Sequence, residues 1–157
     1  MSKKQMLIVD DNQGLREALR TVFEDEYELA FAGSGEEALR FTFKRRPEVV
    51  LMDYRMPGMD GLETLSYLKK LAPDSRTVVM SAFDDRNQVE QFLSAGATDF
   101  VGKPFDVQDI KHKIARAAAT APKLVEYQPE VKKTEPVISR REVDDMINQT
   151  LRLAACL

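Results

Sequence analysis

The chain has 157 residues, a formal net charge of −3 and 43% hydrophobic residues, enough apolar material for one domain with a short extension. This net charge disfavours binding of nucleic acid or an anionic membrane through an overall basic field. A single histidine, His112, and a single cysteine, Cys156, argue against His- or Cys-based metal sites and against a Ser-His-Asp hydrolase. No stretch approaches the ~20 apolar residues that span a bilayer, and we find no signal peptide. The single cysteine fits a reducing setting, so we expect a cytoplasmic protein.

Short apolar segments alternate with amphipathic segments along the first 119 residues. The apolar segments have the composition of strands buried on both faces, as in a parallel sheet covered by helices. They lie at 6–9, 27–32, 49–52, 77–80 and 100–102. The helical spacing of apolar residues predicts helices at 13–24, 36–44, 60–71, 84–93 and 107–119.

Side chains that cap helices support these boundaries. Asn12 precedes the first predicted helix, and Ser34 precedes the second, with Glu37 three residues later in the pattern of a capping box. In the first helix, the spacing places Ala18 on the apolar face and Arg16 toward solvent.

Five strands alternating with five helices predict a doubly wound, flavodoxin-like α/β fold, with a five-stranded parallel sheet in the order 2-1-3-4-5. That order makes the first and third strands neighbours. Such sheets bind ligands beyond the carboxyl ends of the strands, where the strand order reverses. At that edge the apolar segments stop on polar residues, which are Asp10 and Asp11, Asp53, Ser81 and Lys103.

Asp53 is the central candidate, because its strand ends there and a Pro/Gly loop follows at once. Carboxylates that meet at one edge repel, so a proton or a cation has to neutralise them. Oxygen ligands without histidine or cysteine favour Mg²⁺, which suits the transfer of a phosphoryl group to an attacking carboxylate. Lys103 would then pair with one phosphoryl oxygen, and Ser81 would bind another. Taken singly, Asp10 and Asp11 would also fit a helix start, Ser81 a turn and Lys103 an exposed surface charge.

The chain from Lys4 to about Ala119 resembles the receiver domain of two-component response regulators, which have the chemotaxis-type receiver fold. Four motifs in the family's order and spacing carry the resemblance. They are Val9-Asp10-Asp11, Asp53-Tyr54-Arg55-Met56-Pro57-Gly58-Met59-Asp60-Gly61, Met80-Ser81-Ala82 and Gly96-Ala97-Thr98-Asp99-Phe100-Val101-Gly102-Lys103-Pro104-Phe105.

The resemblance implies that Asp53 accepts a phosphoryl group from a sensor histidine kinase or a phosphotransfer protein. It also implies that Mg²⁺ is held by Asp10, Asp11, Asp53 and the backbone carbonyl of Arg55. The added charge then changes the face formed by the fourth and fifth helices, which contacts a downstream protein or a second copy of the chain.

The resemblance assigns roles to three further residues. Ser81 is similar to the family's switch hydroxyl, and Phe100 is similar to the aromatic residue that moves with it. Lys103 is similar to the phosphate-binding lysine, and its bond to Pro104 is expected to be cis.

The composition changes after residue 119. We expect a receiver domain at 1–120, a flexible proline-containing linker at 121–138 and an amphipathic helix at 139–157. Docking of that helix on its own receiver, pairing with a copy, binding in a partner's groove and the start of an output domain all stay open. Nothing resembles a complete DNA-reading unit, so we expect no direct contact with nucleic acid, and none with a membrane.

Two other functions fit part of the pattern. A Mg²⁺-dependent phosphatase of the haloacid dehalogenase type also forms an aspartyl phosphate, but it requires a second acid two residues after the nucleophile, where this chain has Arg55. A receiver-like scaffold would need no phosphorylation, but all of the site residues are present. We therefore expect a switch that assists its own phosphorylation and dephosphorylation, and not a conventional enzyme.

Overall fold

The computed structural model describes residues 2–82 and 86–120, together with residues 141, 144, 145 and 148. Residues 1–124 form one compact unit and residues 125–157 form a second. The expected linker at 121–138 lies outside the described residues, as does most of the helix expected at 139–157. The four residues described in that segment are helical.

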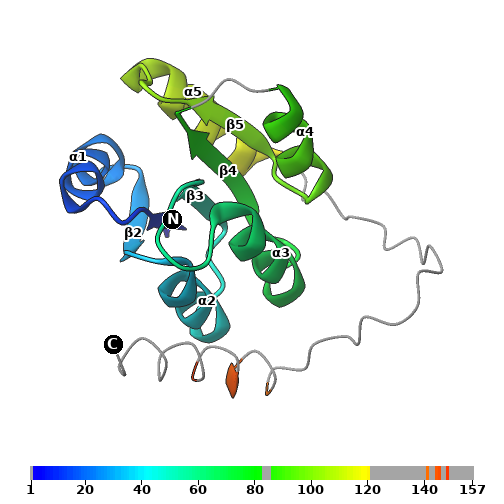
Figure 1. The fold of residues 1–157 in the computed structure, drawn as a ribbon. Helices are drawn as coiled ribbons and strands as arrows, with labels where there is room; N and C mark the ends of the chain where they lie inside the picture. The colour runs from blue at the N-terminus through cyan, green and yellow to red at the C-terminus, as the bar shows by residue number, and fades with distance from the viewer. Residues whose placement is uncertain (1, 83–85, 121–140, 142–143, 146–147, 149–157) are drawn as a thin grey trace. The chain divides into compact units, whose positions relative to one another are not determined.

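Within the described residues, five parallel strands form one sheet in the order β2-β1-β3-β4-β5 (Figure 1). The strands are β1 (Lys4–Val9), β2 (Tyr27–Ala32), β3 (Val49–Asp53), β4 (Arg76–Ser81) and β5 (Asp99–Gly102). The helices are α1 (Gln13–Phe23), α2 (Gly35–Lys44), α3 (Gly61–Leu71), α4 (Arg86–Ser94) and α5 (Val107–Ala119). The predicted doubly wound, flavodoxin-like α/β fold is therefore confirmed.

Helices cover both faces of the sheet. α1 contacts α5 on one face, whereas α2 contacts α3 and α3 contacts α4 on the other (Figure 1). Alternate residues of a strand point to opposite faces. The buried cluster beneath α1 and α5 accordingly includes Ile8, Leu51 and Met80 from the strands, with Leu19 and Ile114 from the helices. All five residues of β3 are buried, as expected for a central strand with helices on both sides.

The predicted capping residues begin their helices. Asn12 accepts a hydrogen bond from the backbone N–H of Leu15 at 3.1 Å, and Ser34 accepts one from that of Glu37 at 3.2 Å. The Glu37 carboxylate accepts from the backbone N–H of Gly33 at 2.8 Å, one residue before the partner that a capping box uses. These bonds supply partners for backbone groups that the helix itself cannot pair.

The structure corrects the predicted start of the first strand and the predicted position of Ala18. β1 begins at Lys4 and not at residue 6, because Lys4 and Gln5 pair with β2 although they precede the apolar segment. Ala18 is exposed, because the inward stripe of α1 centres on Leu19 and Phe23 and the short side chain of Ala18 lies at its edge.

Gly61 begins α3 where that helix passes the end of β3. Its N–H donates to the Tyr54 carbonyl at 2.8 Å. A Cβ atom at residue 61 would lie 2.8 Å from Tyr54 Cα and 2.9 Å from the Asp53 carbonyl oxygen. Both atoms belong to the backbone, so only glycine allows this approach. Among the described helices, none combines the length and apolar character needed to cross a membrane.

Candidate functional site

The carboxyl ends of neighbouring strands bring the predicted site residues to one edge of the sheet. Asp10 follows β1 directly, Asp53 ends β3 and Ser81 ends β4. β3 pairs with β1 on one side and with β4 on the other, so Asp53 lies between the other two. Lys103 follows β5, and its backbone N–H donates to the Ser81 carbonyl at 2.7 Å. The structure thus gathers residues from four strands.

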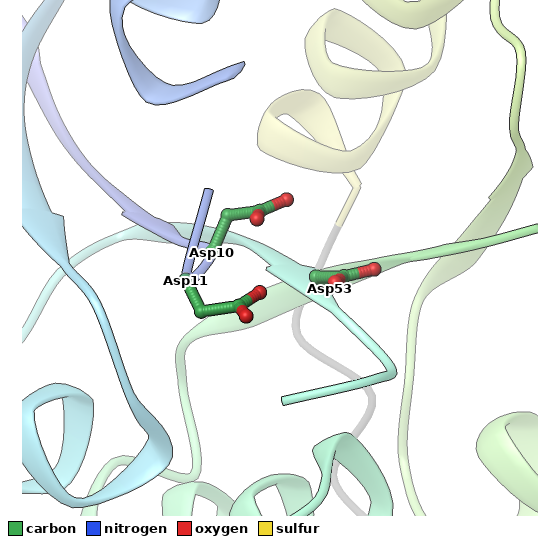
Figure 2. Close-up of side chains that lie close together, drawn as sticks. All are labelled: Asp10, Asp11 and Asp53. Carbon is green, nitrogen blue, oxygen red and sulfur yellow. The ribbon is translucent and has the colours of Figure 1, made fainter. Parts of the chain in front are cut away.

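Figure 2 shows the side chains of Asp10, Asp11 and Asp53 lying close together. Each offers one carboxylate oxygen, and these three oxygens lie within 4.8 Å of one another. Asp10 is 1% exposed and Asp53 is 7% exposed, whereas Asp11 is open to solvent. An all-oxygen set with one solvent-facing ligand fits a hard cation that keeps part of its water shell, and Mg²⁺ is such a cation.

Lys103 links two of these acids. Its Nζ atom lies 3.0 Å from Asp53 Oδ1 and 3.4 Å from Asp10 Oδ2. The ammonium group therefore offsets part of the negative charge from the β5 side of the site. The peptide bond between Lys103 and Pro104 is cis, as the resemblance implied.

Burial raises the pKa of Asp53 above its ordinary value, because water solvates its charged form poorly there. The hydrogen bond and charge of Lys103 lower this pKa, whereas the charges of Asp10 and Asp11 raise it, and the net direction is upward. Asp53 thus takes up a proton more readily than an exposed aspartate does, and added positive charge would oppose this shift.

We expect Asp53→Asn to raise the Tm of the protein by a few degrees at neutral pH in EDTA. The folded-state pKa of Asp53 lies above its unfolded value, so its contribution to stability falls as pH rises through that folded-state pKa. The neutral amide removes this cost, and its advantage should shrink as pH falls and wild-type Asp53 takes up a proton. Thermal unfolding at several pH values measures the effect, with the exposed Asp74→Asn as control. A lower Tm for Asp53→Asn at neutral pH would contradict the expectation.

Two groups hold the loop that carries Asp10. The backbone N–H of Asn12 donates to Asp10 Oδ1 at 2.8 Å, and Arg16 Nη1 donates to the Asp10 carbonyl at 2.6 Å. The expectation that Arg16 faces solvent is wrong, because its side chain is half-buried over this loop. A helical side chain leans toward the N-terminus of its helix, so a residue in the first turn of α1 was able to reach back to Asp10.

The two predicted switch residues both contact α4. Ser81 is buried, and its hydroxyl donates to Gln88 Oε1 at 3.2 Å. Phe100 is half-buried and stacks on Phe92, with ring centroids 6.4 Å apart. Gln88 was not predicted from the sequence, because no local pattern indicates which residue of α4 meets Ser81. The Arg55 side chain is exposed, and the metal-binding role of its carbonyl stays a prediction.

A doubly wound parallel sheet with three carboxylates, a lysine and a hydroxyl at its carboxyl edge defines a class of phosphoacceptor switch proteins. Residues 6–115 match the family model of the response regulator receiver domain. The chain belongs to this family and acts as a response regulator receiver in two-component signalling. Receivers of this family interact with histidine kinases or phosphotransfer proteins and with downstream effectors.

The relatives and solved structures that are similar to this chain include the following three. Sporulation initiation phosphotransferase F of Bacillus subtilis is 35% identical over 117 residues, which cover 74% of this chain and 94% of that protein. One chain of a CheX–CheY complex from Borrelia burgdorferi, solved with BeF₃ and Mg²⁺, matches with a TM-score of 0.71 and 26% sequence identity. The match covers 76% of this chain and 92% of that chain. A Burkholderia pseudomallei response regulator, solved with a phosphorylated aspartic acid, a calcium ion and citrate, matches with a TM-score of 0.68 and 26% sequence identity. The match covers 74% of this chain and 69% of that chain.

Proposed function

We propose that Asp53 is the phosphoacceptor and that its phosphorylation requires Mg²⁺ held by Asp10, Asp11 and Asp53, with the backbone carbonyl of Arg55. The observation that best supports this proposal is the position of Asp53. This residue ends a central strand, and its carboxylate lies beside two other acids and 3.0 Å from the ammonium of Lys103. The phosphorylated aspartic acid of the Burkholderia pseudomallei relative supports the same chemistry here.

In the proposed reaction, a carboxylate oxygen of Asp53 attacks the phosphorus of the donor. The bond between phosphorus and the leaving group breaks, the leaving group departs with the electron pair, and Asp53 carries an acyl phosphate. Lys103 is placed to pair with a phosphoryl oxygen, and the Ser81 hydroxyl is placed to donate to another. When bound, Mg²⁺ supplies positive charge that keeps Asp53 ionised and offsets the phosphoryl charge.

We infer that the donor is a sensor histidine kinase or a phosphotransfer protein, and that the transfer takes place in the cytoplasm. The output surface is the face formed by α4, β5 and α5, where half-buried Phe100 lies beside α4, and its partner is a downstream protein or a second copy. The amphipathic pattern of the sequence at 139–157 makes that segment a second candidate for binding the partner. The protein turns over no external phosphoester, because Arg55 stands where a phosphatase of this kind places its second acid.

Intact-mass analysis after incubation with acetyl phosphate tests the proposal. We expect a single phosphoryl adduct that forms with Mg²⁺, fails to form in EDTA and is removed by hydroxylamine, which cleaves acyl phosphates. Asp53→Asn should abolish the adduct, because an amide cannot attack phosphorus as a carboxylate does. Asp74→Asn, at an exposed position, should be phosphorylated like the wild type. An adduct that persists in folded Asp53→Asn would refute the assignment.

A further inference from the structure

Gln88 connects the start of α4 to the site. Its Oε1 atom accepts a hydrogen bond from Ser81 Oγ at 3.2 Å. Ser81 is 1% exposed, so water competes little for this hydroxyl. Gln88 also borders a cavity of about 420 Å³ on the segment that follows Asp53. The other lining residues are Tyr54, Arg55, Met56, Pro57 and Asp60.

The same face of α4 makes a second contact with the strands around the site. Phe92 lies four residues after Gln88 and therefore shares its helix face. The Phe92 ring packs edge-on against Tyr54, with centroids 5.0 Å apart, and it stacks on Phe100. Because Tyr54 directly follows Asp53, the position of this helix face is coupled to both β3 and β5.

We propose that the hydrogen bond from Ser81 to Gln88 is a feature of the unphosphorylated protein and that this contact weakens the binding of a phosphoryl group at Asp53. The inference rests on the proposed role of Asp53. A serine hydroxyl has one proton to donate. While Ser81 donates it to Gln88 Oε1, it cannot donate it to a phosphoryl oxygen. Phosphorylation therefore has to break the Ser81–Gln88 bond before Ser81 can contribute to the site.

This exchange gives the phosphoryl group a direct route to α4. When Ser81 turns to the phosphoryl oxygen, α4 loses one of the contacts that hold its first turn against β4. The contacts of Phe92 then carry more of the coupling between this helix and the strands. Phosphorylation thus shifts the population between two positions of α4. The size of the shift is set by the difference in free energy that the Ser81 contact makes between those two positions.

Calorimetric titration of the full chain with BeF₃⁻ in saturating Mg²⁺ tests the proposal, because this anion occupies the place of a phosphoryl group on a carboxylate. We expect Gln88→Ala to bind BeF₃⁻ about fivefold more tightly than the wild type, which corresponds to the net loss of one competing neutral hydrogen bond. Gln91→Ala is the matched control, since Gln91 is an exposed glutamine on the same helix, and it should bind like the wild type. If Gln88 only supported the structure of the site, Gln88→Ala would bind BeF₃⁻ more weakly than the wild type.

A double-mutant cycle identifies the contact responsible. In the background of Ser81→Ala, the further change Gln88→Ala should leave the Kd for BeF₃⁻ nearly unchanged, because the shared contact is already gone. If Gln88→Ala binds BeF₃⁻ no more tightly than the wild type does, the inference is overturned. Binding of BeF₃⁻ by the wild type would still support the proposed role of Asp53. A wild type that binds no BeF₃⁻ and forms no adduct with acetyl phosphate would overturn the proposed function, and this inference with it.

Discussion

Lys103→Met should slow the Mg²⁺-dependent phosphorylation of Asp53 by acetyl phosphate by about 10²-fold or more, which is the typical cost of removing one preorganised charge-stabilising donor. The Lys103 ammonium lies 3.0 Å from Asp53 Oδ1, so it would lie close to a phosphoryl group on either oxygen of this carboxylate. Methionine keeps much of the side-chain length but has no charge to offer a phosphoryl oxygen. Time-resolved intact-mass analysis measures the rate.

The matched control for this prediction is Lys111→Met. Lys111 pairs with Glu26 at 3.3 Å on the surface, and its loss should leave the phosphorylation rate unchanged. Far-UV circular dichroism should show that both variants are folded at the assay temperature. A Lys103→Met protein that is folded and phosphorylated at the wild-type rate would show that the lysine does not stabilise the transferred group.

Gly61→Ala should lower the free energy of unfolding by about 2 kcal/mol, which is a typical cost of forcing an extra carbon into a packed site. The new Cβ would press on Tyr54 Cα and on the Asp53 carbonyl oxygen, which are backbone atoms and cannot move aside as a flexible side chain can. Urea denaturation measures the change, and we expect the midpoint to fall without a large change in slope.

Gly102→Ala is the control for this second prediction. A Cβ at residue 102 would meet no atom within 4 Å, so its effect on the free energy of unfolding should stay within about 0.5 kcal/mol. Because the clash at residue 61 reaches the carbonyl of Asp53, Gly61→Ala should also slow phosphorylation in the fraction that stays folded. Equal stability of the two variants would show that α3 shifts freely away from β3.

The strands and the carboxylate cluster were predictable from the sequence because both depend on short-range patterns. A parallel sheet buries its central strands on both faces, so those strands contain continuous apolar runs, and the residue that ends such a run lies at the binding edge. Asp10, Asp53 and Ser81 each end such a run or directly follow it. Once the strand order was inferred, their proximity followed.

The residues that support the site could not be predicted in the same way. The hydrogen bond from Arg16 to the Asp10 carbonyl depends on the angle at which α1 leaves β1, and helical periodicity does not contain that angle. The bond from Ser81 to Gln88 depends on the path between β4 and α4. Both contacts join residues whose types are ordinary on a helix surface, so the sequence pattern assigned Arg16 to solvent and gave Gln88 no role.

The contacts of Lys103 also bear on the valence of the ion that the site prefers. When all three carboxylates are ionised, they and the Lys103 ammonium together carry two net negative charges, which is the number that one divalent cation cancels. A monovalent ion would leave the site negative and a trivalent ion would make it positive, so we expect the site to favour a divalent ion by charge, before ligand distances select by size. An incoming phosphoryl group, itself an anion, then meets a site that no longer repels it.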